Sequence, residues 1–178
     1  VSIGSDNADV TKAKAGDTVT VSFTVSEGVG VLPVVTIDGN AADGVVNTGG
    51  NDYEATRLMQ AGDTEGVIGF TIDYDDAAGN AGVQVTSTTD ASTVTYDESV
   101  PTVVSVVPGS LADVDAGVVN VTITFDEAMT TGVNPSPVIT GLASGYTIVG
   151  SSWANGDTEW SGSFTFNDDG EEAVGTYE

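Results

Sequence analysis

The sequence of 178 residues contains no cysteine and no histidine. Without these residues the chain forms no disulfide bond, no zinc site of the usual Cys/His kind, no thiolate nucleophile and no Ser-His pair. The two absences exclude most common catalytic chemistry. Adjacent acidic pairs such as Asp168-Asp169 do not replace it, because neighbouring strand residues point to opposite faces. We therefore expect a protein that is not an enzyme.

Basic residues are almost as scarce, since 3 Lys and Arg residues oppose 27 Asp and Glu residues, for a formal net charge of −24 at pH 7. Nucleic-acid binding needs clustered basic side chains that displace counterions from phosphates. Only Lys12, Lys14 and Arg57 are present, so we expect no nucleic-acid partner. No apolar run approaches the roughly 18 residues of a membrane-spanning helix, so we expect no membrane insertion.

What the sequence does contain is alternation with a period of two. Residues 18–25 alternate polar and apolar side chains, which predicts a strand whose odd-numbered residues face a core. Shorter alternations, separated by Gly, Asn and Asp clusters, follow at Ile68, Phe70 and Ile72, at Val83 and Val85, and at Val94 and Tyr96. No amphipathic helix pattern stands out. Short strands at this spacing predict an all-β fold, most simply an antiparallel β-sandwich.

The sequence also repeats itself. At an offset of 100, Val19, Val21 and Phe23 fall on apolar residues of a second alternating run, Val119, Val121 and Ile123. Further along, Tyr53 falls on Trp160 and Phe70 on Tyr177 at an offset of 107, which small loop insertions explain. The repeat predicts two domains, residues 1–99 and 100–178, which meet at the extended Val100-Pro101 junction. Because Glu178 corresponds to Thr71, we expect the second domain to lack the equivalents of residues 72–99, its final strands.

Short motifs carry a family resemblance. Residues 13–19 read Ala-Lys-Ala-Gly-Asp-Thr-Val, residues 63–66 read Asp-Thr-Glu-Gly, and residues 76–82 read Asp-Ala-Ala-Gly-Asn-Ala-Gly. With Ser26-Glu27 and the Val-Pro-Thr-Val run at residues 100–103, these motifs resemble the bacterial immunoglobulin-like repeats of very large surface adhesins. The resemblance covers the first copy and, less closely, the second. It implies tandem immunoglobulin-like antiparallel β-sandwiches, the second incomplete, that act as a stalk in a secreted or surface-attached protein.

Acidic and amide side chains gather in turns that the strand count brings together. The turn after Glu27 and the turn at residues 75–82 should emerge at the same end of the first domain. Calcium takes six to eight oxygen ligands and accepts loose loop geometry. The sequence therefore predicts a calcium site, formed in the first copy by Glu27, Asp73, Asp75, Asp76 and Asn80, and in the second by Asp126 and Glu127 with the linker residues Asp97 and Glu98. Alternatively, these residues are solvated acidic turns that make only turn hydrogen bonds.

The two tryptophans have different predicted roles. Trp153 lies in residues 151–157, Ser-Ser-Trp-Ala-Asn-Gly-Asp, which read as a loop, so Trp153 is the candidate ligand-binding aromatic. Alternatively, it caps the end of a sandwich. Trp160 aligns with Tyr53 and shares an alternating face with Gly162 and Phe164, which predicts a position in the core.

From these observations we predict a non-catalytic spacer repeat of an extracellular adhesin or bacterial cell-surface protein, whose partners are neighbouring repeats of the same array. A second hypothesis is a subunit of a self-assembling filament, in which a neighbouring chain donates the missing strands to an open sheet edge. A third is a carbohydrate-binding module that uses Trp153.

Overall fold

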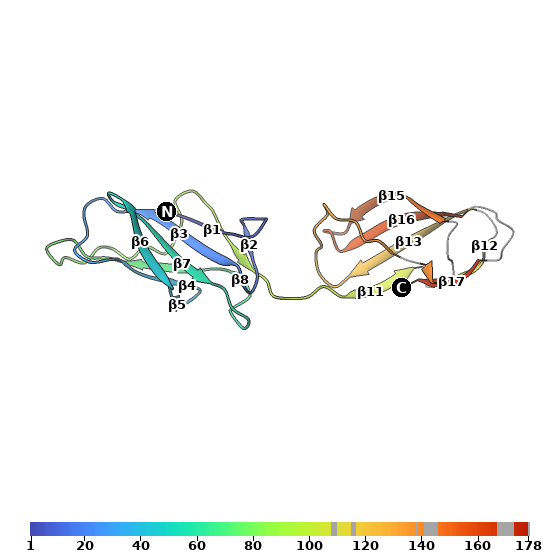
Figure 1. Cartoon of the computed structure of the whole chain (residues 1–178), viewed down its shortest axis with the longest axis horizontal. Helices are drawn as coiled ribbons and strands as arrows, with labels where there is room; N and C mark the ends of the chain where they lie inside the picture. The colour runs from blue at the N-terminus through green and yellow to red at the C-terminus, as the bar shows by residue number, and fades with distance from the viewer. Residues whose placement is uncertain (108–109, 115–116, 138, 141–145, 167–172, 178) are drawn as a thin grey trace. The chain divides into compact units, whose positions relative to one another are not determined.

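The chain forms two separate all-β units, Val1–Ser99 and Val100–Glu178 (Figure 1). The computed structural model describes residues 1–107, 110–114, 117–137, 139–140, 146–166 and 173–177. Every regular element in these ranges is a β-strand, and the strands pair antiparallel except for β2 with β10, which confirms the predicted β-sandwich class. The described residues include no helix of the length and apolarity that crossing a membrane requires.

The first unit consists of three sheets built from ten strands. One sheet has the order β1-β3-β7-β6, a second the order β2-β10-β8 and a third the order β5-β4-β9. The strands are β1 (Ser2–Ser5), β2 (Lys12–Ala13), β3 (Thr18–Thr24), β4 (Val34–Ile37), β5 (Asn40–Ala41), β6 (Gly44–Gly49), β7 (Asp52–Leu58), β8 (Gly66–Val67), β9 (Phe70–Asp73) and β10 (Thr95–Tyr96).

The core of the first unit follows from alternation along its strands. In β3 the odd-numbered Val19, Val21 and Phe23 are buried, as the sequence predicts. Phe23 lies opposite Tyr53 of β7, and the two rings stack with their centroids 5.6 Å apart. The opposite layer contributes, among others, Val35, Ile37, Phe70, Ile72, Val94 and Tyr96. Burial of these side chains from both layers supplies the main stabilisation of the unit.

One strand prediction in the first unit is wrong. Val83 is 84% exposed and lies outside the described strands, whereas Val85 makes only an isolated bridge with Ile72. The physical reason is that Tyr74 and Gly82 meet here: a Cβ on Gly82 would lie 2.4 Å from the Tyr74 ring. The chain therefore runs close to Tyr74 through a turn before Val85 joins β9.

The turn between β4 and β5 shows how local sequence sets a hairpin. Asp38 and Gly39 both have positive φ, 51° and 71°. An Asp-Gly pair with left-handed backbone at both central positions is typical of a tight two-residue hairpin, whose twist matches that of the strands. This hairpin places the Asp38 carboxylate beside the loop that follows β7, where it accepts a hydrogen bond from the Thr64 N–H (3.1 Å).

The second unit repeats the larger sheet of the first. Its strands are β11 (Val103–Val107), β12 (Ser110–Val114), β13 (Gly117–Phe125), β14 (Ile139–Thr140), β15 (Tyr146–Ala154), β16 (Glu159–Phe166) and β17 (Ala173–Tyr177). The order β11-β13-β16-β15 corresponds to β1-β3-β7-β6. Even the register is preserved, because Ile123 faces Trp160 as Phe23 faces Tyr53. Trp160 and Phe164 are fully buried, so the predicted core role of Trp160 is confirmed.

The three-stranded sheet that begins with β2 and the three-stranded sheet of the second unit differ in their central strand. In the first unit β10 lies between β2 and β8, with β2 parallel and β8 antiparallel to it. In the second unit β12 pairs directly with β17, in the order β12-β17-β14. The described core of the second unit is correspondingly small: four buried residues, Val121, Ile123, Trp160 and Phe164, form its hydrophobic cluster.

Candidate functional site

One end of the first unit carries a small polar cavity of about 230 Å³. Three of the predicted calcium ligands, Glu27, Asp76 and Asn80, lie in its wall beside Val29 and Tyr74. The Gly30 N–H donates to the Asp75 carbonyl oxygen (3.3 Å), and Val29 forms a bridge with Asp76. The prediction that these two turns emerge at the same end is therefore confirmed.

The Asp76 carboxylate is the centre of its own turn. Its Oδ1 accepts the N–H groups of Ala78 and Asn80, both at 2.8 Å, and its Oδ2 accepts the Asn80 side-chain amide at 2.6 Å. These hydrogen bonds, above all the one from the Asn80 side chain, lower the pKa of Asp76. The carboxylate is thus held in its charged form by turn donors, which is the turn role that Asp and Asn commonly play.

The other two predicted ligands of this site lie elsewhere on the turn. Asp73 accepts two hydrogen bonds from the Gln84 side-chain amide, at 2.9 and 3.1 Å, and does not line the cavity. Asp75 forms a bridge with Ala81 and likewise does not line it. Successive strand residues point to opposite faces, so Tyr74 and Asp76 share one side and Asp73 and Asp75 the other. The five predicted ligands are therefore split between two faces.

The second predicted set is divided between the two units. Asp97 and Glu98 belong to the first unit, and Asp126 and Glu127 to the second. Asp126 accepts the Thr102 N–H (2.7 Å) and hydroxyl (2.5 Å), and these bonds lower its pKa. Glu127 is half-buried. In the described part of the chain, no three acidic side chains lie close enough together to hold a metal ion, and calcium remains a prediction from the sequence.

Trp153 does not lie in a loop, so that part of its prediction is wrong. It belongs to β15, opposite Trp160 of β16, and is half-buried. Its ring packs at a centroid distance of 5.8 Å from Phe125. The turn comes just after it, at Asn155, Gly156 and Asp157, which all have positive φ. The Asn-Gly-Asp signal thus marks a turn one residue beyond Ala154 and leaves Trp153 in the strand.

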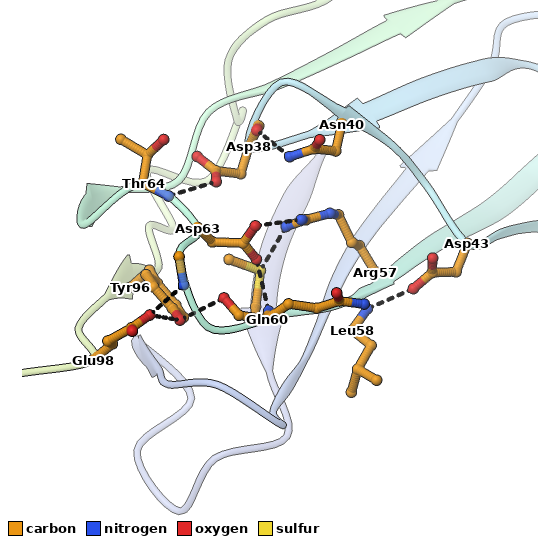
Figure 2. A network of polar contacts seen from close by, with 12 residues as sticks. Asp38, Asn40, Asp43, Arg57, Leu58, Gln60, Asp63, Thr64, Tyr96 and Glu98 are labelled. Atoms are coloured by element: carbon orange, nitrogen blue, oxygen red, sulfur yellow. Dashed lines mark hydrogen bonds and ion pairs between the residues drawn. The ribbon is translucent and has the colours of Figure 1, made fainter.

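A polar network that the sequence analysis did not identify lies at the other end of β7 (Figure 2). Arg57, only 7% exposed, donates to the Asp63 carboxylate at 2.6 Å, and its other terminal nitrogen lies 3.3 Å from the Met59 sulfur. The bond to Asp63 raises the pKa of Arg57, and the same bond lowers the pKa of Asp63. Asp63 also accepts the Gln60 N–H at 2.7 Å. The sequence contains a signal for this pair, because Arg57 continues the series of alternate, buried positions that Tyr53 and Ala55 begin in β7.

The same loop holds the end of the first unit through Tyr96 and Glu98. The Glu98 carboxylate accepts the Gly62 N–H at 2.8 Å and the Tyr96 hydroxyl at 2.7 Å. The Tyr96 hydroxyl also lies 2.8 Å from the Gln60 carbonyl oxygen. Burial, helped by the adjacent Glu98 carboxylate, raises the pKa of Tyr96 to about 12. The Ser99 hydroxyl donates to Glu65 at 3.1 Å, so residues 96–99 are fastened to residues 60–65. Figure 2 shows the contacts of Tyr96 and Glu98 with this loop.

The two terminal segments of the first unit run side by side in the same direction. Thr89 bonds to Val1 through its N–H (2.8 Å), and Ile3 donates to the Ser92 hydroxyl (2.9 Å). Further on, the Thr95 N–H donates to the Thr11 carbonyl and the Asp97 N–H to the Ala13 carbonyl, both at 2.9 Å. The pairing of β10 with β2 is parallel. We refer to these contacts between residues 1–13 and 89–97 as the terminal pairing.

Compared with known proteins, the chain matches no family model and no curated sequence.

Proposed function

We propose that this chain is a non-catalytic spacer segment of an extracellular, bacterial surface protein, in which tandem units supply length and resist tension. The terminal pairing is the observation that supports this function best. The repeat motifs at residues 13–19, 63–66 and 76–82 support the surface location, and the neighbouring repeats are the proposed partners.

The terminal pairing has a direct mechanical meaning. Residues 1–13 and 89–97 are parallel, so tension applied at Val1 and Ser99 pulls the two segments past each other along their length. The backbone bonds Thr95–Thr11 and Asp97–Ala13 then carry load together with those at Val1 and Ile3. Bonds that share a load must break nearly together, which raises the barrier to forced unfolding, and that barrier governs the unfolding rate under force.

The contacts of residues 96–99 also resist tension. Tyr96, Glu98 and Ser99 are fastened to the loop at residues 60–65 at the point where the chain leaves the first unit. Tension entering at Ser99 is therefore transmitted to the β7–β8 loop, which the buried Arg57–Asp63 pair holds in place. A unit built to bear load benefits from this arrangement, whereas an unloaded domain does not require it.

Single-molecule pulling tests the proposal. Because the chain has no cysteine, engineered cysteines provide unique handles. Handles at Val1 and Ser99 of the full chain load the terminal pairing along its length. Handles at Val46 and Glu54, which are exposed cross-strand partners, open the β6–β7 hairpin one pair at a time. We expect a clearly higher rupture force with the first pair of handles. Equal or lower force through the terminal handles contradicts a load-bearing role.

A further inference from the structure

The hairpin loop between β15 and β16, residues 155–158, contains the one Asn-Gly pair of the sequence, Asn155-Gly156. Residues 155–157 are exposed, with φ angles of 53°, 67° and 67°. Asn and Gly adopt this left-handed backbone more readily than other residues, which explains their use in hairpin loops. Asn is also a chemically labile residue. The loop therefore combines a structural need for Asn-Gly with a chemical weakness.

The backbone nitrogen of Gly156 is open to reaction. Glycine has no Cβ, so nothing on its own side chain shields the nitrogen. Among the residues that the structure describes, none accepts a hydrogen bond from the Gly156 N–H. The nitrogen is thus accessible to water, to base and to the side chain of the preceding residue.

A hydrogen bond from Thr158 favours reaction at this nitrogen. The Thr158 hydroxyl donates to the Asn155 carbonyl oxygen at 2.9 Å. That oxygen and the Gly156 nitrogen belong to one peptide unit, so the negative charge left when the nitrogen loses its proton is shared by both atoms. A donor already aimed at the oxygen where charge develops stabilises that charge. The fold therefore activates this particular peptide unit.

The Asn155 side chain is held in place by Glu159. Its Nδ2 donates to the Glu159 carboxylate at 3.0 Å. The bond suits an amide, which has N–H groups to donate, and does not suit a carboxylate, which has none. Conversion of the Asn155 amide to an acid would replace this hydrogen bond by repulsion between two negative charges.

We propose that Asn155 is a modification site, at which the side-chain amide is converted to aspartate and isoaspartate through a cyclic imide. The Gly156 nitrogen gives its proton to water and attacks Asn155 Cγ. A new C–N bond forms, the Cγ–Nδ2 bond breaks, and Nδ2 leaves as ammonia with a proton from water. Water then opens the ring at either of its carbonyl groups. The sum consumes one water, releases one ammonia and involves no oxidation or reduction.

The modification alters contacts beyond the loop. The carbonyl oxygens of Asp157 and Thr158 accept the N–H groups of Met129 (3.0 Å) and Phe125 (2.8 Å). Isoaspartate carries the main chain through its side chain, which adds a methylene group just before these carbonyls and displaces them. The Phe125 ring packs against Trp153, with centroids 5.8 Å apart. Trp153 emission therefore reports the loosening of the turn that follows β13.

The test incubates the full, folded chain in warm, mildly alkaline buffer and measures conversion at each Asn by peptide mass mapping, with enzymatic methylation to detect isoaspartate. Asn40 is the internal control, because it is also exposed beside a tight turn but precedes Ala41. We expect conversion at Asn155 to be at least about tenfold faster than at Asn40, since only glycine leaves the nitrogen unshielded. Conversion at Asn155 no faster than at Asn40 overturns the proposal.

Variants of the loop separate the fold's contribution from that of the Asn-Gly pair alone. Thr158→Val should slow conversion about fivefold, the usual weight of one hydrogen bond, whereas Thr158→Ser keeps the hydroxyl and should keep the rate. In urea, where the loop is absent, all three chains should react equally. A Thr158→Val chain that retains native tryptophan emission and converts at the unchanged rate overturns the role of Thr158.

The structural consequence is read from the same incubated samples. Trp153 emission and the urea midpoint of the second unit should change as Asn155 converts, and Asn155→Gln should abolish both changes. Changes that persist in Asn155→Gln contradict the assigned consequence. Pulling loads the first unit and this experiment reads the second, so the modification site and the spacer function fail separately.

Discussion

At the residue scale, the charged side chains divide into a few that are held inside the structure and many that remain in solvent. Arg57 is the only arginine of the sequence, and it forms a buried ion pair with Asp63 rather than a surface contact. A buried ion pair stabilises a protein little more than an apolar pair of similar size would. Removing one partner is nevertheless costly, because the other charge stays buried without a partner. Arg57 therefore fixes one conformation of the β7–β8 loop.

Removal of Asp63 tests this role. We expect Asp63→Ala to lower the free energy of unfolding of the first unit by about 3–5 kcal/mol, because the Arg57 charge stays buried without its partner. Urea unfolding followed by circular dichroism measures the change. The control is Glu54→Gln, a change of an exposed carboxylate in β7 outside the pair, which should cost less than about 1 kcal/mol. Equal effects of the two variants would show that burial of Arg57 does not matter.

A second residue-scale prediction concerns Gly162, over which the Trp160 ring lies. A Cβ added to Gly162 would lie 2.3 Å from that ring, so the indole must move. We expect Gly162→Ala to destabilise the second unit by about 1–3 kcal/mol, the usual effect of overpacking a core. Tryptophan emission during urea unfolding measures it. Gly132→Ala is the control, since nothing lies within 4 Å of its added Cβ.

At the element scale, the features that could be predicted from the sequence were those that follow from the alternation of polar and apolar side chains with a period of two. The alternation of β3, the core position of Trp160 and the shared register of the two larger sheets all follow from side chains that face one layer. Contacts between segments distant in sequence could not be predicted in this way. The terminal pairing joins residues 84 to 89 positions apart, and no local pattern indicates a parallel partner.

The candidate site shows the same limit. Strand counting correctly brought Glu27 to the turn that contains Asp76 and Asn80. Strand counting did not predict that the Asp76 carboxylate accepts hydrogen bonds from its own turn, or that the Asp73 carboxylate accepts them from Gln84. Side-chain hydrogen bonds inside a turn compete with any ligand for the same oxygens, and composition alone does not show which of them wins.

The loop between β2 and β3 yields an element-scale prediction for pH. Asp17 is 8% exposed and accepts the Lys14 ammonium (2.7 Å), the Asn7 amide (2.7 Å) and the Lys14 N–H (2.9 Å). These donors, the Lys14 side chain first, lower the pKa of Asp17 to about 2. Because the folded pKa lies below the unfolded one, the stabilisation is complete above the ordinary Asp pKa and is lost as the pH falls toward the folded value.

We therefore expect the free energy of unfolding to decrease between about pH 4 and pH 2 through this group, and Asp17→Asn to flatten that dependence. NMR titration of the Asp17 carboxyl carbon, with urea unfolding at each pH, measures both quantities. The control is Glu54→Gln, a change of an exposed carboxylate in β7. An Asp17 that titrates at the ordinary value contradicts the role assigned to Lys14 and Asn7.

At the scale of the whole molecule, the net charge of −24 opposes folding through mutual repulsion. Salt screens exposed charges over a Debye length of about 10 Å at 0.1 M. We expect the melting temperature to rise when NaCl is added at neutral pH, by several degrees for each kcal/mol gained. A melting temperature that does not respond to NaCl would show that repulsion is unimportant.

Calcium is tested in the same experiment. The prediction from the sequence is that CaCl₂ raises the melting temperature further than NaCl at equal ionic strength, and that Glu27→Gln removes the additional gain. Chelator should reverse it. An equal effect of the two salts on the chain would assign the acidic turns at residues 73–80 to solvated surface alone.

The terminal pairing also has a consequence for biosynthesis. A ribosome makes residues 89–97 long after their partners at residues 1–13, so the first unit stays open until almost all of it has been translated. Contacts between such distant residues are slow to form. During that interval the core residues against which Val85 packs are exposed to other unfolded chains near the ribosome. Translation rate and chaperone capture should therefore influence how many such units mature correctly.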